Sequence, residues 1–200
     1  METYAYPHFP PSSSAVHVAL FTNVTNASDL RARIVKASTL EGPEGDAERA
    51  RVNFAFIDAR LISSRLHLQT AIYQAILADA QGALRTKTVH SEILWALNPT
   101  NNITEAIRRY GVSDTSSALI IVRVDSPALQ DVEASMRAVV DGTVSPLEDL
   151  TSLTNWSAIK KYYKLNTEPA VKAAAKDASR ERQIVNEIVV SSVAMKSVMG

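Results

Sequence analysis

Apolar positions along the chain follow either the period of a β-strand or that of an α-helix. Three short apolar runs predict β-strands. These runs are 16–21 (VHVALF), 54–57 (FAFI) and 118–124 (ALIIVRV). They are rich in Val, Ile and Phe, which favour strands. In the first run, Val16, Val18 and Leu20 fall on one face. A further strand or a tight hairpin is expected at 139–144, which Asp141-Gly142 interrupts.

The segments between these runs carry helical spacing. The first is expected from Thr25 or Asn26, either of which can cap a helix, to about residue 37. A long helix should follow Asp58, its expected N-cap, and end at Gly82. Its apolar stripe is predicted to be Ile62, Leu66, Gln69, Tyr73, Ile76, Leu77 and Ala80.

The middle of the chain predicts two short helices joined by an Asn-rich turn. The first spans 88–97 and is stopped by Asn98-Pro99. The second spans 102–110, with Asn102 as N-cap, Glu105 three residues on, and Gly111 after its end.

Three more helices are expected in the last third of the chain. One is opened by Pro127, one spans 157–163, and the last runs from Pro169 to about residue 199. The second half of this last helix, IVNEIVVSSVAMKSV, is apolar around more than one face. Such a helix either closes the core or leaves apolar residues for a partner, and both can hold at once.

Two segments are expected to lie outside the packed fold. Residues 1–14 contain three prolines and three consecutive serines and predict a flexible arm. Residues 41–52 are acidic and interrupted by Gly and Pro, which predicts a disordered surface insertion. The rest, 15–200, is expected to form a single domain.

Composition narrows the classes of protein. Twenty-one basic and 21 acidic side chains give no net charge, so binding to nucleic acid would require a local patch. The absence of cysteine fits a reducing intracellular compartment. No run of about 18 apolar residues predicts a membrane span, so no membrane partner is expected.

No catalytic or metal-binding constellation is visible. The four histidines lack paired spacing, and neither of the glycine-rich phosphate loops occurs. We therefore expect no catalytic residue, no metal site and no cofactor. The basic residues Arg85 and Lys87 could contact phosphates, although a solvated surface is the more ordinary interpretation. Trp95 and Tyr110 are expected in a core or an interface.

Several blocks of sequence resemble one known family. The run 86–122 (TKTVHSEILWALNPTNNITEAIRRYGVSDTSSALIIV) closely resembles the Cgi/TPRKB family, the small subunit of the KEOPS (EKC) complex. The blocks VHVALFTNVTNASDLR, FAFIDARLISSRLHLQTAIYQA and IKKYYKL are similar to the same family and occur in order. The arrangement FAFIDARL resembles a fungal member. The chain departs from the family at 42–51 and at 169–182.

The resemblance implies an α/β (α+β) fold in which helices cover a mostly antiparallel sheet. It implies a non-enzymatic subunit that binds a PRPK-type kinase directly and a Kae/OSGEP-type catalytic subunit through the complex. It also implies binding of the 3′ CCA end of tRNA, support of threonylcarbamoyl-adenosine (t6A) modification, a link to telomeres, and a location in nucleus and cytoplasm.

Carried onto this chain, the resemblance suggests two sets of contact residues. The kinase would meet the last helix at Ile184, Ile188, Val189, Ser192 and Met195. The tRNA end would meet Arg85, Thr86, Lys87, His90, Ser91 and Asn101. Two alternatives remain open: a purely structural adaptor of the kinase without tRNA contact, and a small-molecule-binding or enzymatic α/β domain.

Overall fold

Five antiparallel strands form the sheet of this protein, whose residues 1–199 are described by a computed structural model. The strands are β1 (Glu2–Ala5), β2 (Ala15–Thr22), β3 (Ala55–Asp58), β4 (Ala118–Asp125) and β5 (Thr143–Ser145). Their order is β1-β2-β4-β3, and β5 also pairs with β2. Because β4 pairs along the whole of β2, β1 and β5 share the other edge of β2.

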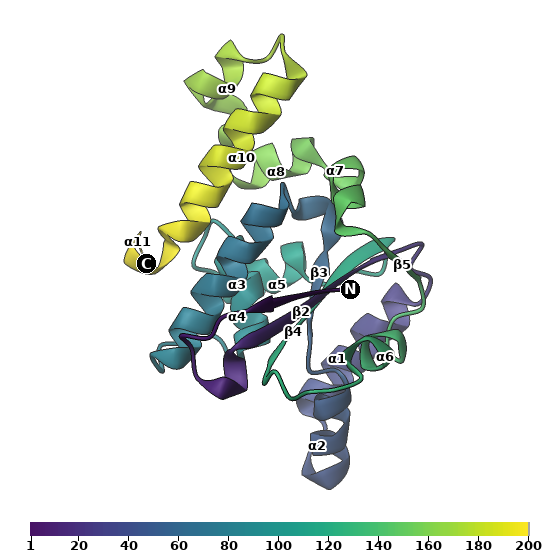
Figure 1. The fold of residues 1–200 in the computed structure, drawn as a ribbon. Coiled ribbons are helices and arrows are strands. Elements are labelled where there is room, and N and C mark those ends of the chain that lie inside the picture. Colours follow the sequence, from purple (N-terminus) through teal and green to yellow (C-terminus); the bar gives the residue numbers. More distant parts are fainter. Residues whose placement is uncertain (200) are drawn as a thin grey trace.

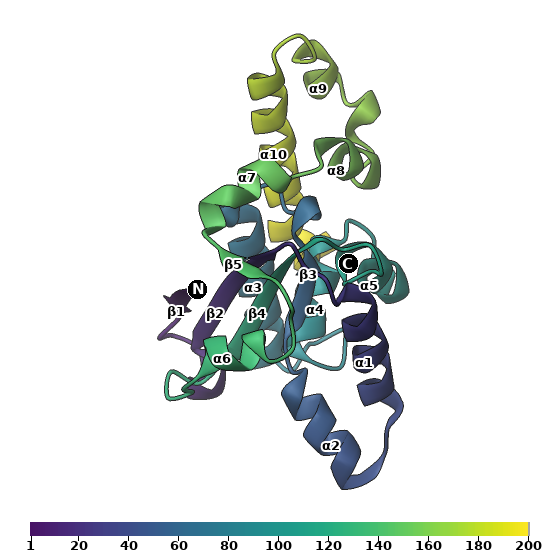
Figure 2. The ribbon, with the colours of Figure 1, turned by 90° about the vertical axis from the view of Figure 1, so that its right-hand side faces the viewer.

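Helices fill both sides of this sheet. They are α1 (Ala27–Thr39), α2 (Gly42–Arg51), α3 (Arg65–Ala80), α4 (Val89–Leu97), α5 (Ile103–Tyr110), α6 (Val132–Arg137), α7 (Leu150–Leu153), α8 (Trp156–Tyr162), α9 (Pro169–Ala173), α10 (Ala178–Ala194) and α11 (Lys196–Met199). Figures 1 and 2 show α9 and the start of α10 standing out at one end of the molecule and α2 at the other.

The central strands are buried on both faces, which explains why β2 is apolar at almost every position. Val16, Val18 and Leu20 share a core with residues of α3 and α4. Ala19 and Phe21 point to the opposite face and share a second core with α1 and α6. Alternate side chains of a strand point to opposite faces, so a sheet covered twice needs a continuous apolar run. The predicted α/β fold, with an antiparallel sheet covered by helices, is confirmed.

The first 14 residues are not a loose arm. Residues Glu2 to Ala5 pair with β2, and Tyr6 N–H donates to Ser14 O at 2.8 Å. Tyr4, Tyr6 and Phe9 pack against the first core. These aromatic side chains therefore hold the segment against the core, although its prolines and serines indicated a flexible arm.

The acidic segment after α1 was expected to be disordered, and that expectation is wrong. It forms the helix α2, with a proline in its first turn. Glu48 forms ion pairs with Arg33 of α1 and with Arg51. Arg49 Nη1 donates to the carbonyl oxygens of Ala37 and Leu40 at the end of α1. Most α2 residues remain exposed, so α2 is a surface helix held to α1 by charged side chains.

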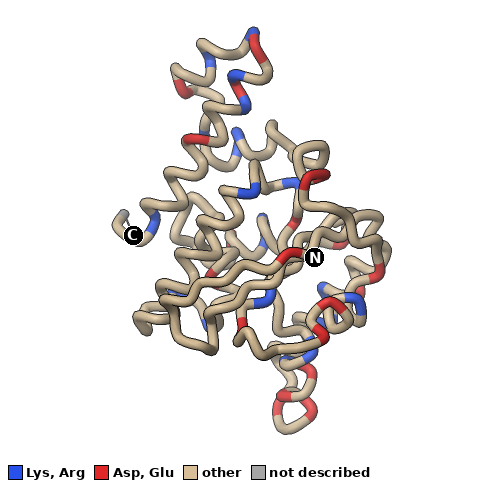
Figure 3. Tube along the Cα trace, viewed as in Figure 1, with Lys and Arg blue, Asp and Glu red and all other residues tan. Residues whose placement is uncertain are grey.

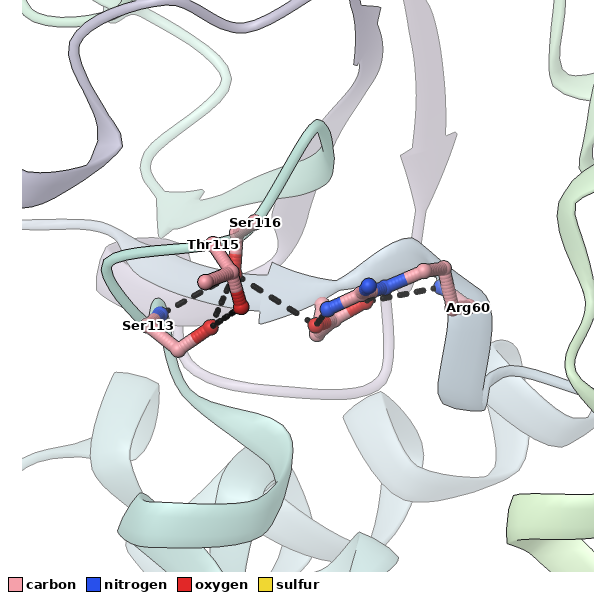
Figure 4. Close-up of polar contacts among 5 residues, drawn as sticks. Arg60, Ser113, Thr115 and Ser116 are labelled. Atoms are coloured by element: carbon pink, nitrogen blue, oxygen red, sulfur yellow. Dashed lines mark hydrogen bonds and ion pairs between the residues drawn. The ribbon is translucent and has the colours of Figure 1, made fainter.

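Asp58 does not cap the long helix, which corrects the expected start of α3. Its carboxylate accepts from the backbone N–H of Arg60 at 3.0 Å and from the Arg60 guanidinium at 2.9 and 2.6 Å. Ser116 Oγ donates to Asp58 Oδ2 at 3.4 Å. Figure 4 shows Arg60 facing the hydroxyl side chains of the loop before β4. Asp58 thus caps the start of a short 3₁₀ helix, Ala59–Leu61, and Ser64 caps α3 instead.

The buried face of α3 also differs from the predicted stripe. Leu66 is 56% exposed and Tyr73 is 37% exposed, whereas Leu68 and Ile72 are fully buried. Ile62 precedes the helix and is buried in the turn. Gly82 does end the helix as predicted, with φ +63° and its N–H bonded to Asp79 O.

Two other helices are shorter than the sequence predicted. The helix expected from Pro127 begins only at Val132, after Asp131 adopts a left-handed conformation with φ 56°. The single final helix is divided into α9, α10 and α11, because Asp177 accepts from the N–H groups of Ser179 and Arg180 and starts a new helix. Of the strand or tight hairpin expected at 139–144, only Thr143 and Val144 lie in a strand, as part of β5.

The burial pattern of α3 gives a direct stability test. Leu68→Ala should lower the free energy of unfolding by about 2–5 kcal/mol, since it leaves a cavity in the first core. The control Leu66→Ala, on the exposed side of the same helix, should change it by no more than about 0.5 kcal/mol. Urea denaturation measures both. Equal losses would show that α3 does not pack with this face inward.

Candidate functional site

A buried carboxylate organises the loop before α4. Glu92 is 1% exposed, and its oxygens accept from Arg85 N at 3.0 and 3.1 Å and from Thr86 N at 2.8 Å. The hydroxyl of Thr86 also donates to Glu92, at 2.6 Å. Hydrogen bonds to an ionised acceptor are stronger than neutral ones, so Glu92 fixes the backbone that carries Arg85 and Lys87.

Hydroxyl side chains continue this network to the start of α4. Thr88 and Ser91 form a reciprocal capping box, with Ser91 N donating to Thr88 Oγ1 at 3.1 Å and Thr88 N donating to Ser91 Oγ at 3.2 Å. Ser91 Oγ lies 3.0 Å from Thr86 Oγ1. Thr86 and Ser91 thus shape the loop from within, while Arg85 and Lys87 are exposed.

His90 does not lie on the surface with Arg85 and Lys87. Its side chain is buried, and its Nε2 accepts the backbone N–H of Val124 at 3.0 Å. Burial lowers the pKa of His90 to about 3, so the ring is neutral at physiological pH. This residue connects α4 to β4, and its side chain is not available for a surface contact.

Asn101 lies at the other end of α4 from this loop. The nine residues of α4 span roughly 13 Å at 1.5 Å per residue. Asn101 is exposed in a turn that Asn98 holds from inside, with Asn98 Nδ2 donating to Thr100 O at 3.0 Å and Thr100 Oγ1 at 2.8 Å. The structure therefore brings Arg85, Thr86, Lys87 and Ser91 together but places Asn101 apart from them.

The residues expected to contact the kinase divide between two sides of α10. Val189 is fully buried in the small core beneath the helix, so its side chain does not face outward. Ile184 and Ile188 are partly buried beside that core, and Met195 is 51% exposed. A shallow groove of about 470 Å³ runs along the outer face, lined by Glu187, Ile188, Ser191, Ser192 and Met195.

A second, smaller cavity joins residues from both expected contact sets. It measures about 240 Å³ and is lined by Pro99, Thr100, Asn101, Ser192 and Lys196. Asn101 and Ser192 thus face the same space, although 91 positions separate them in the sequence.

The sequence interpretation missed three buried polar residues that position these surfaces: Glu92, Asn98 and Lys196. Each had a visible signal. Glu92 and Lys196 are single charged residues within otherwise apolar helical stretches, and buried charges of this kind need partners. Asn98 directly precedes a proline, where a turn is common.

The distribution of charged residues bears on whether the chain holds a metal site or a membrane span. Figure 3 shows acidic and basic residues interspersed over the molecule. Within residues 1–199, no cluster of three or more His, Asp or Glu side chains could hold a metal ion. In the same part of the chain, none of the helices combines the length and apolar character needed to cross a membrane.

Comparison with known proteins identifies the family of this chain. Residues 21–197 match the model of the family described as kinase binding protein CGI-121. A relative from Cryptococcus neoformans, named EKC/KEOPS complex subunit CGI121, is 37% identical over 96% of this chain and all of its own length. Proteins of the same name from Neurospora crassa and Aspergillus fumigatus are 33% and 34% identical; the matches cover 98% and 84% of this chain and 98% and 85% of the relatives. This chain belongs to the CGI-121 family of kinase binding proteins.

Proposed function

We propose that this protein is a non-catalytic subunit of a KEOPS (EKC) complex that binds a PRPK-type kinase subunit through the outer face of α10. The observation that carries the proposal is the apolar groove on α10, present in a chain whose family is described as kinase-binding. The fungal relatives are named as subunits of this complex.

The α10 face has the physical character of a protein-binding surface. Ile188, which is partly buried, and Met195, which is 51% exposed, border the groove. They lie beside the face by which Val185, Val189 and Val193 anchor the helix to the protein. An apolar stripe held on a rigid helix can bury its area in a partner without the cost of ordering a loop. Val189 takes part by holding the helix in place and not by touching the partner.

In the same proposal, the protein also binds the 3′ CCA end of tRNA, at the loop that carries Arg85 and Lys87. Both side chains are exposed at the end of a backbone that Glu92 fixes, which suits contacts to phosphates. Thr86, Ser91 and His90 support the loop and α4. The net charge of zero supplies little long-range attraction, so the isolated subunit should bind tRNA weakly.

In this proposal the chemistry resides elsewhere in the complex. A Kae/OSGEP-type subunit, reached through the complex, carries out the t6A modification, and the protein supports it in nucleus and cytoplasm with a linked role at telomeres. The alternative is an adaptor that regulates the kinase without touching tRNA. The burial of His90 and the separate position of Asn101 favour a smaller RNA contact than the sequence suggested.

The kinase contact can be tested by placing a charge on α10. Ile188→Glu should abolish co-purification with the kinase subunit, because the carboxylate would be desolvated in the apolar interface. The control Val35→Glu alters an equally apolar, 57% exposed position on α1 and should leave co-purification intact. Circular dichroism should show both variants folded. Undiminished co-purification of a folded Ile188→Glu variant would move the interface away from α10.

The RNA contact can be tested by reversing two charges. The double variant Arg85→Glu, Lys87→Glu should weaken binding to tRNA and reduce the salt dependence of the affinity by a slope of about two, one for each lost phosphate contact. The matched control Lys172→Glu, Lys176→Glu makes the same charge change at exposed positions near α9. Filter binding across a salt series measures both. Equal affinity and slope for the two variants, with kinase binding retained, would favour the adaptor alternative.

Glu92 provides a separate test of how the loop is held. Glu92→Gln should lower the free energy of unfolding by at least about 1.5 kcal/mol, because the amide accepts more weakly and turns an N–H group toward donors. The control Glu133→Gln loses only an exposed ion pair with Arg137 and should cost less than about 1 kcal/mol. Thermal melting measures the difference, and faster amide exchange at residues 85 and 86 should accompany it. A Glu92→Gln variant with unchanged stability and exchange would show that the carboxylate does not organise the loop.

A further inference from the structure

Lys196 is a buried ammonium group at the junction of the C-terminal helices and the α4–α5 turn. Its side chain is 6% exposed. Nζ donates to Asn98 O and, at 2.8 Å, to Thr100 O, and it lies 4.3 Å from the centre of the Trp95 ring. These contacts hold α11 against the end of α4.

Among residues 1–199, no anion is bound directly to the positive charge of Lys196. Its partners are two neutral carbonyl groups and an aromatic face, and within residues 1–199 no carboxylate oxygen lies within 4.0 Å of Nζ. Burial lowers its pKa to about 8, and Glu92, at longer range, opposes that shift. A buried charge without a counter-charge is costly, and an added anion would relieve that cost.

The carboxylates near this site already have ion-pair or hydrogen-bond partners. Glu105 forms an ion pair with Arg109, and Arg109 also donates to Asn98 Oδ1 at 3.3 Å. Glu92 is occupied by the loop that carries Arg85. The nearby Glu187 lies in the wall of the α10 groove and accepts a hydrogen bond from Gln183 Nε2 at 2.9 Å. None of these carboxylates is among the residues lining the cavity that contains Lys196.

That cavity opens beside the apolar groove of α10. Ser192 lines both, so a partner lying along the groove would have the polar cavity at its end. Two of the remaining walls are polar groups that can donate to an oxygen anion, the Asn101 amide and the Ser192 hydroxyl, whereas the Thr100 hydroxyl already donates to Glu105 Oε2. The volume of about 240 Å³ accommodates a carboxylate group. The arrangement pairs an apolar surface with an adjacent cationic pocket.

We propose that the protein partner bound on α10 inserts an acidic side chain into this cavity, where its carboxylate binds Lys196, Ser192 and Asn101. The proposal rests on the proposed kinase contact and adds the chemistry that makes it specific. The apolar groove supplies the surface that is buried on binding, and the carboxylate fixes the position of the partner along α10. An isolated anion, such as phosphate, is the competing occupant.

Binding of a carboxylate in the cavity should be accompanied by the uptake of a proton. A carboxylate beside Nζ raises the pKa of Lys196 from about 8, so the complex should take up a proton when it forms near pH 8. Calorimetric titration of the full chain with the kinase subunit, in buffers of different ionisation enthalpy, measures this uptake. The uptake should vanish in Lys196→Gln, which keeps a donor for the two carbonyls but carries no charge.

The same titrations give the affinities of the variants. Lys196→Gln should bind the kinase subunit about 10- to 100-fold more weakly, the range expected for loss of a charge-assisted hydrogen bond. Lys196→Arg should retain part of the affinity. Lys172→Gln, at an exposed position on α9, is the matched control and should bind as the unaltered protein does. Thermal melting confirms that each variant is folded.

The outcomes separate this inference from the proposed function. If Ile188→Glu abolishes binding while Lys196→Gln binds normally and proton uptake is unchanged, the α10 interface stands and the carboxylate contact is wrong. If Ile188→Glu leaves binding intact, the proposed interface itself fails. If inorganic phosphate alone binds tightly in a Lys196-dependent way and leaves kinase affinity unaltered, the cavity is a site for a free anion and the proposal is overturned.

Discussion

The antiparallel ladder between β2 and β4 determines where both helical layers lie. The two strands pair along eight residues, from Ala15 opposite Asp125 to Thr22 opposite Ala118. Alternate side chains then point to opposite faces, so each strand supplies both cores. The helices α3 and α4 can cover one face and α1 and α6 the other only because this ladder is apolar on both sides. A polar residue in the middle of either strand would be buried whichever way it pointed.

Outside these two apolar cores, a few buried polar groups position the loops that face outward. Glu92 holds the backbone of the Arg85–Lys87 loop at one end of α4, and Asn98 holds the turn at the other end. His90 joins the same helix to β4 through the N–H of Val124. Since buried polar groups are costly unless they are satisfied, each of these contacts favours one loop conformation over others. These contacts therefore define the loop conformations at the two ends of α4.

The fold could be predicted from sequence where local signals and tertiary packing agree. The strands β2 and β4, the helix α4 and the cap at Asn102 all appear where the residues indicated. The start of α3 could not be predicted, because Asp58 and Ser64 are both good capping residues and the choice depends on Arg60 and Ser116. The predicted apolar stripe was right at Ile76, which is fully buried, and wrong at Leu66 and Tyr73, which are exposed.

The candidate site was predictable only in part, for a related reason. Arg85 and Lys87 are exposed in the loop named from the sequence, yet His90 and Val189 are buried. A residue type shows what chemistry a side chain can perform, whereas its direction depends on contacts from distant segments. The contact of Lys196 with Asn98 joins residues almost 100 positions apart, and no local pattern encodes it.

The central claim is that the outer face of α10 is the surface on which the kinase subunit binds. Amide hydrogen exchange of the full chain, alone and in complex with that subunit, tests it most directly. The account predicts that added protection concentrates in α10 and α11 and in the adjoining turn at Pro99 to Asn101. Protection confined to α1, α2 and α6, with α10 exchanging as in the free protein, would contradict it.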